Sequence, residues 1–125
     1  MNIDRYDDDR TPAVMQAQTG ATSWRSAVNS QQQADSDHGD WYAIAGEMVD
    51  TLRCLSSLTT VLAQQIGGYG QGRVLRDDDP TVDPAERITD TVRRAEWLRA
   101  HLDIAERSAD DLWSLIGHIA VEVDR

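Results

Sequence analysis

The sequence predicts an all-α protein built on a long antiparallel helical hairpin. Two stretches place apolar residues every three or four positions, and a segment rich in glycine and aspartate separates them. Spacing of three and four puts side chains on one face of a helix. A connection of this length makes antiparallel pairing of the two helices the natural arrangement.

The first helix is expected over residues 40–66. Asp40 can cap its start by accepting a hydrogen bond from a free backbone N–H. Gly67 and Gly68 are expected to end it, because glycine adopts the left-handed conformation common just past a helix terminus. Its apolar stripe consists of Trp41, Ile44, Met48, Leu52, Leu55, Leu58, Leu62 and Ile66.

The second helix is expected over residues 84–123, after a loop at 67–82. Asp83, Pro84 and Glu86 form a capping box with proline at the first helical position. A heptad pattern follows, which is typical of a coiled-coil seam. Ser108 and Asp111 also resemble a cap, but the heptad phase continues through them and favours one unbroken helix. One core row holds Ile88, Ala95, Leu102, Ala109, Ile116 and Val123, and the other holds Thr91, Leu98, Ala105, Leu112 and Ile119.

Residues 1–37 are polar and carry few large apolar side chains. We read them as a flexible arm, with short helices conceivable near 13–18 or 27–34. The hairpin then spans residues 38–125.

The expected helices differ in length, so the second would extend past the first. Its C-terminal half is apolar over a wide arc that one hairpin cannot cover. Either the N-terminal arm or a second copy has to pack there. A homodimer that completes a four-helix bundle is the economical solution.

Charge and cysteine content restrict the classes of partner. The formal net charge is −10, with 22 acidic residues against 12 basic residues. Such a chain is a poor ligand for nucleic-acid phosphates and for anionic membranes, and it favours basic proteins. A single cysteine and the lack of a basic and apolar leader at the start of the sequence indicate a cytoplasmic protein.

The sequence contains no pattern typical of catalysis, and we expect no enzyme, no cofactor and no metal. His118 and Glu122 are the only helical pair with ligand spacing, and two ligands do not make a metal site. Cys54 has no histidine near it in sequence and is expected to be a small buried hydrophobe. The Gly-rich loop lacks the preceding strand and the following lysine of a phosphate-binding loop.

Large apolar residues outside the intramolecular seam indicate contact with another chain. Trp97 and Ile104 are seven residues apart on one face, and further apolar residues follow toward the C-terminus. The predicted protein interface comprises Trp97, Ile104, Leu112, Trp113, Leu115, Ile116, Ile119 and Val123.

Part of the chain resembles small proteins of actinobacterial plasmids, integrative elements and phages. The resemblance rests on residues 70–78, on Asp83-Pro84-Ala85-Glu86-Arg87, and on the alanine-rich helix ending at residues 116–119. It implies a mobile-element context. All basic residues are arginine, which indicates the codon usage of a high-GC bacterium.

These features predict a non-enzymatic protein–protein interaction module, an accessory or assembly factor that dimerises and binds another protein. The alternative is an acidic inhibitor that occupies the basic groove of a nucleic-acid-binding protein. The acidic residues that would do so are Asp90, Glu96, Asp103, Asp110 and Asp111.

Overall fold

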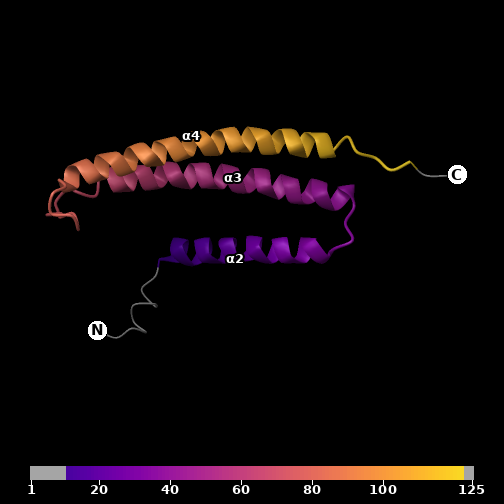
Figure 1. Ribbon diagram of the computed structural model, residues 1–125, viewed down its shortest axis with the longest axis horizontal. Coiled ribbons are helices and arrows are strands. Elements are labelled where there is room, and N and C mark those ends of the chain that lie inside the picture. Colours follow the sequence, from indigo (N-terminus) through magenta and orange to yellow (C-terminus); the bar gives the residue numbers. More distant parts are fainter. Residues whose placement is uncertain (1–10, 123–125) are drawn as a thin grey trace, which may run out of the picture. The chain divides into compact units, whose positions relative to one another are not determined.

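The computed structural model describes residues 11–122 of the 125-residue chain. Within that range it contains the helices α2 (Pro12–Gln33), α3 (His38–Gly67) and α4 (Pro84–Ile116), and no strand (Figure 1). The all-α prediction is confirmed for these residues. The chain divides into one unit that ends at Ser36 and another that begins at Asp37.

Helix α2 forms where the sequence indicates a flexible arm, so that prediction is wrong for residues 12–33. Thr11 caps the helix by accepting a hydrogen bond from the backbone of Val14, and Pro12 occupies the first turn. The sequence does place apolar residues at helical spacing here, but two of the five are alanine, so the signal for a helix is weak. Its apolar stripe consists of Val14, Ala17, Ala21, Trp24 and Val28.

Helix α3 begins at a reciprocal capping box. The Asp37 side chain accepts a bond of 3.0 Å from the backbone N–H of Asp40, and the Asp40 side chain accepts one of 3.3 Å from that of Asp37. The start at His38 lies two residues before the predicted one because Asp37, not Asp40, is the cap. The helix ends at Gly67, close to the predicted end.

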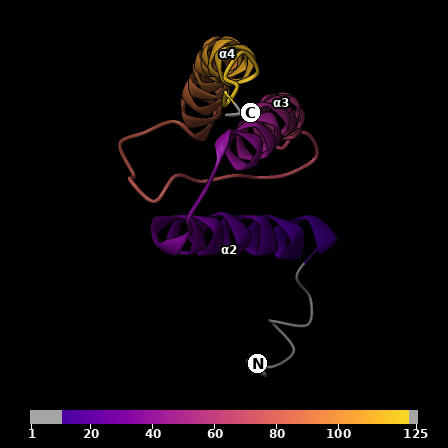
Figure 2. The ribbon, with the colours of Figure 1, turned by 90° about the vertical axis from the view of Figure 1, so that its right-hand side faces the viewer.

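Figure 2 shows the loop between α3 and α4 as a long segment without helix or strand. Polar side chains of the loop and of the start of α4 hold it. Arg87 donates two hydrogen bonds, of 2.7 and 3.2 Å, to the carboxylate of Asp77. Asp79 accepts bonds from both the backbone and the hydroxyl of Thr81. Gly72 has a φ of +71°, a conformation that favours glycine. The loop therefore returns to α4 in a defined conformation without regular structure.

Helix α4 begins at Pro84 with Asp83 as its cap, as predicted. The Asp83 side chain accepts a 3.0 Å bond from the backbone of Ala85, not from Glu86 as in the predicted capping box. It runs unbroken through Ser108. It ends at Ile116 rather than at residue 123, and Val123 lies outside the described residues. Helices α3 and α4 have 30 and 33 residues, so the predicted overhang of the second helix is wrong.

Helices α3 and α4 lie side by side and antiparallel (Figure 1). Gly67 near the end of α3 lies beside Val92 near the start of α4, and Gly46 lies beside Trp113 at the opposite end. The hairpin prediction is thereby confirmed. No helix among residues 11–122 has the length and apolarity needed to cross a membrane.

The seam that joins the two helices is made mostly of small residues on α3. Ala45, Val49 and Thr59 are its buried members, and Val49 is only 1% exposed. The α3 residues at seam positions are Ala45, Val49, Leu52, Ser56, Thr59, Ala63 and Ile66.

On α4, one of the two predicted core rows is confirmed: Ala109 is buried, and Ile88, Ala95, Leu102 and Ile116 are half-buried. The other predicted row is wrong, because Leu98, Leu112 and Ile119 are about half exposed. The positions that face α3 instead are Val92, Arg99, Glu106 and Trp113.

Candidate functional site

The candidate site is one side of the hairpin on which large apolar side chains stay exposed. We call this surface the apolar face. On α3 the residues recur every three or four positions, beside the small-residue seam. The apolar face comprises Trp41, Ile44, Met48, Leu55, Leu58 and Leu62 of α3 and Leu98, Leu112 and Leu115 of α4.

These residues of the two helices lie on the same side of the pair. Arg53 meets Glu106, and Gly46 meets Trp113, which fixes the side of the seam that these four residues occupy. On each helix, the heptad row that flanks the seam on its other edge must then lie on the opposite side of the helix pair. In this register Met48 lies level with Leu112, and the apolar face runs along both helices.

The side chains of the apolar face are larger than most of the α3 side chains in the intramolecular seam. Eight of its residues are between 39% and 67% exposed, and Ile44 is half-buried. A fully exposed large apolar side chain offers on the order of 150–200 Å². The eight residues together thus leave on the order of 600–800 Å² of surface in contact with water.

The apolar face carries no acidic residue within the two helices, although the chain is strongly acidic. The heptad rows that form it also contain the ionisable residues Arg87, Arg94 and His101. The Arg94 guanidinium lies 5.2 Å from the centre of the Trp97 ring, and His101 Nδ1 is 2.7 Å from the carbonyl oxygen of Trp97. The other positions of the same rows are filled by Thr51, Gln65, Thr91, Ala105 and Ser108.

The opposite side of the hairpin is polar and carries the contacts between charged groups. Ser56 donates a 2.6 Å hydrogen bond to the carboxylate of Asp103. Arg53 forms an ion pair with Glu106, and the hydrogen bond to Glu106 raises the pKa of the Arg53 guanidinium. The two sides of one helix pair therefore differ in chemistry.

The end of the hairpin away from the loop is closed by aromatic packing. The rings of Tyr42 and Trp113 lie 5.3 Å apart between centroids. A Cβ atom on Gly46 would lie 3.2 Å from the Trp113 indole, so any other residue there would press on the ring. The indole Nε1 is buried without a hydrogen-bond partner, which indicates that packing and not polar bonding places the ring.

The structure distributes the predicted interface residues over several places. Leu112 and Leu115 lie on the apolar face, whereas Trp113 packs against α3 and Ile116 occupies a half-buried seam position. Trp97 and Ile104 are each 58% exposed, in the row that points away from α3. Ile119 is exposed just past the end of α4, and Val123 is not among the described residues.

Sequence reasoning missed the role of α3 in this surface. It assigned Trp41, Met48 and Leu55 to the seam with the second helix, yet they are exposed. The available signal was a second repeat of three and four on the same helix, formed by the small residues around Val49. A helix with two such repeats packs on two sides.

Cys54 is exposed, not buried as predicted, and lies on the side of α3 that faces away from α4. Among the described residues no group of three or more His, Cys, Asp or Glu is placed to hold a metal ion.

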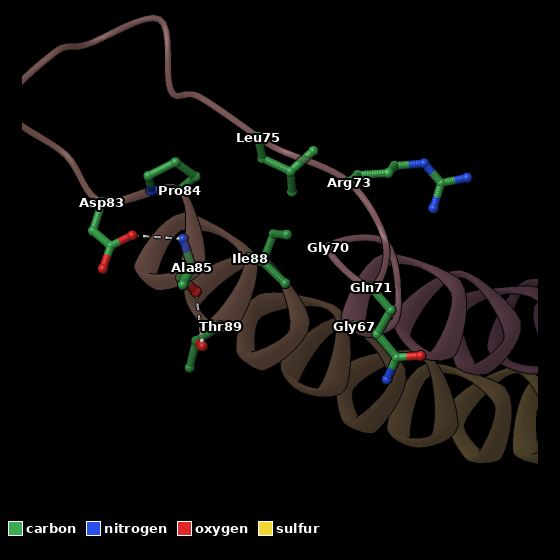
Figure 3. A pocket seen from close by; sticks show the side chains of 10 residues that line it. All are labelled: Gly67, Gly70, Gln71, Arg73, Leu75, Asp83, Pro84, Ala85, Ile88 and Thr89. Carbon is green, nitrogen blue, oxygen red and sulfur yellow. Dashed lines mark hydrogen bonds between the residues drawn. The ribbon is translucent and has the colours of Figure 1, made fainter.

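A shallow cavity of about 470 Å³ lies between the loop and the start of α4 (Figure 3). Leu75 and Ile88 form its apolar part, beside Gly70. The Asp83 carboxylate already occupies the helix start by accepting the bond from Ala85. The cavity is therefore a packing space beneath the loop.

Comparisons with protein-family models, with curated proteins and with solved structures found no match.

Proposed function

We propose that the protein is a non-enzymatic protein–protein interaction module, an accessory or assembly factor that works by presenting the apolar face to helices of another chain. The observation that carries the proposal is the exposed repeat on α3. Trp41, Met48, Leu55 and Leu62 recur at seven-residue intervals while the seam with α4 is made of smaller residues. Apolar patches of this size mark interaction sites.

Two hairpins placed with their apolar faces together complete a four-helix bundle. This arrangement buries a second seam on each helix and resembles the way in which bundle cores are built from several helices. A two-helix unit alone has little core, and association with another chain supplies the missing burial.

The proposed setting is the cytoplasm of a high-GC bacterium, on a phage or another mobile element. The arginine-only basic composition and the resemblance noted for residues 70–78 support this setting. In that setting the assembled module would bind another component of the mobile element and assist the assembly of that component.

The rival function is that of an acidic inhibitor of a nucleic-acid-binding protein. One observation favours it: Glu96, Asp103 and Asp110 stand seven residues apart in one row of α4. The row is weakened as a docking surface because Asp103 is bonded to Ser56 and Arg53 lies next to it on the polar side. The proposal therefore rests on the apolar face.

Capture of partners from the native host at low and at high salt separates the two functions. Contacts made by the apolar face should survive 1 M salt, whereas contacts made by exposed carboxylates should be lost. The variant Leu55→Glu with Leu62→Glu should lose the partner, and the variant Glu96→Gln with Asp110→Asn should keep it. The reverse result would support the inhibitor and overturn the proposal.

A further inference from the structure

We infer that the first occupant of the apolar face is a second copy of this chain, related to the first by a two-fold axis. The inference rests on the proposed interaction function and names the partner of the same surface. A symmetric pair joins the same patch of both copies, so the patch has to be compatible with itself in size, in shape and in charge.

The charge distribution meets this condition. Two copies that each carry a net charge of −10 repel one another unless their carboxylates are kept apart. The acidic residues of α3 and α4 all lie outside the apolar face. They are Asp40, Glu47 and Asp50 on α3, and Glu86, Asp90, Glu96, Asp103, Glu106, Asp110 and Asp111 on α4.

The same distribution argues against a basic protein as the occupant of this face. A basic partner would gain most from contact with carboxylates, and the apolar face offers it Arg94 and His101 instead. Like charges across an interface disfavour the wrong partner. A second copy brings an apolar surface of its own with no acidic group in it.

The available area also fits a symmetric pair. The apolar face leaves on the order of 600–800 Å² per copy in contact with water, by the side-chain areas used above. Specific protein interfaces bury about 800 Å² per partner. A face of this size is sufficient for a stable dimer without a contribution from the polar side of the hairpin.

The single cysteine allows the arrangement to be tested on the full-length protein. Cys54 is exposed on α3 and faces away from α4, outside the apolar face. Neighbouring helices in a bundle lie about 8–10 Å apart. Spin labels on the two copies of Cys54 in a two-fold dimer should therefore give one distribution of distances between the copies, whereas a monomer should give none.

The variant that tests the face is Leu55→Glu with Leu62→Glu, and the matched control is Ser57→Glu with Gln64→Glu. Both place two glutamates seven residues apart on α3, one pair on the apolar face and the other on the polar side. Sedimentation equilibrium should show that the wild type and the control are dimers at about 10 µM. The apolar-face variant should dissociate at least about 100-fold more readily, because a buried charge would lack a partner.

Three results would overturn the inference, and they have different consequences for the proposed function. If the wild type is monomeric at about 200 µM and the apolar-face variant keeps its urea midpoint, the face is free and serves a different partner. If the wild type is monomeric and that variant unfolds at much lower urea, the face is covered within one chain, and the proposed function fails as well. A dimer that neither variant weakens would use another surface and would also overturn the inference.

Discussion

The seam between α3 and α4 and the apolar face beside it belong to the same two helices, yet they are built from different residues. The seam uses alanine, serine and threonine on α3 and closes the hairpin tightly around Val49. The apolar face uses tryptophan, methionine and leucine and leaves them about half exposed. Small residues on α3 thus let the two helices approach each other, while a second row of large apolar residues on the same helix stays exposed.

The largest difference should appear when the same charge is placed in the seam and at an exposed position of the same helix. Val49 is the most buried large side chain, and Val61 on the same helix is 44% exposed. Val49→Asp should unfold the hairpin, because a buried carboxylate without a partner is costly. Val61→Asp should leave the helical circular dichroism spectrum and the urea midpoint nearly unchanged. Equal effects of the two substitutions would remove the distinction between seam and surface.

The next largest effect concerns the glycine beneath the Trp113 ring. Gly46→Leu should destabilise the hairpin by about 1–3 kcal/mol, because a side chain cannot fit against the indole without a shift of the helices. Gly20 has no atom within 4 Å of an added Cβ, so Gly20→Ala serves as the control and should be neutral or slightly stabilising. Thermal unfolding followed by circular dichroism measures both. A Gly46→Leu protein as stable as the wild type would contradict the packing described here.

Truncation of a large side chain on the apolar face should cost the monomer little. Leu→Ala in a packed core costs about 2–5 kcal/mol. Leu62→Ala should lower the free energy of unfolding by less than about 1 kcal/mol at concentrations at which the protein is monomeric, because Leu62 is 44% exposed there. Urea denaturation at low and high protein concentration checks this. A core-sized loss at low concentration would place Leu62 in the interior of a single chain.

Acidification should release the contact between Asp77 and Arg87 that holds the loop. The hydrogen bonds from Arg87 lower the pKa of Asp77 from 3.8 to about 2, and the Asp77 side chain is only 5% exposed. Because the pKa in the folded protein is lower than in the unfolded chain, this contribution to stability is fully present above pH 3.8. It is lost as the pH falls through about 2. NMR titration of the loop should show this transition, and Asp77→Asn should abolish it while Asp78→Asn should not.

The smallest effect should come from the exposed ion pair on the outer side of α4. Asp90 and Arg93 are bonded at 3.2 Å, and both side chains are more than 60% exposed. Arg93→Ala should change the free energy of unfolding by no more than about 0.5 kcal/mol, since water screens such pairs. Urea denaturation in low salt measures the change. A loss several times larger would mean that this outer surface is packed against something.

The sequence predicts the helical hairpin well but cannot decide which side of each helix faces the other. On α4 the row through Ala109 has neighbouring rows through Leu112 and through Trp113, and either could complete the seam. The apolar row was the natural choice by hydrophobicity alone. The structure takes the row with Glu106 and Trp113, because Gly46 accommodates the indole and Arg53 pairs with Glu106.

The remaining differences have equally local causes. Helix α2 was overlooked because alanine fills two positions of its stripe, between Val14 and Trp24. The heptad phase of α4 continues beyond Ile116, yet the helix stops there. Helix α3 starts at His38 and Tyr42 lies against Gly117, so α4 ends about one turn short of the start of α3. Caps, in contrast, depend on short sequences, and the cap at Asp83 was predicted correctly.

The oxidation of methionine tests most directly whether another chain buries the apolar face. Met48 lies on the apolar face, whereas Met15 lies on α2 and is 56% exposed, so it serves as an internal reference in the same sample. Peroxide converts an accessible methionine to its sulfoxide, and mass spectrometry of peptides follows each site. We expect Met48 to be oxidised at least about 10-fold more slowly at high micromolar than at nanomolar protein concentration, with Met15 unaffected by dilution. A rate for Met48 that does not depend on protein concentration would contradict the account.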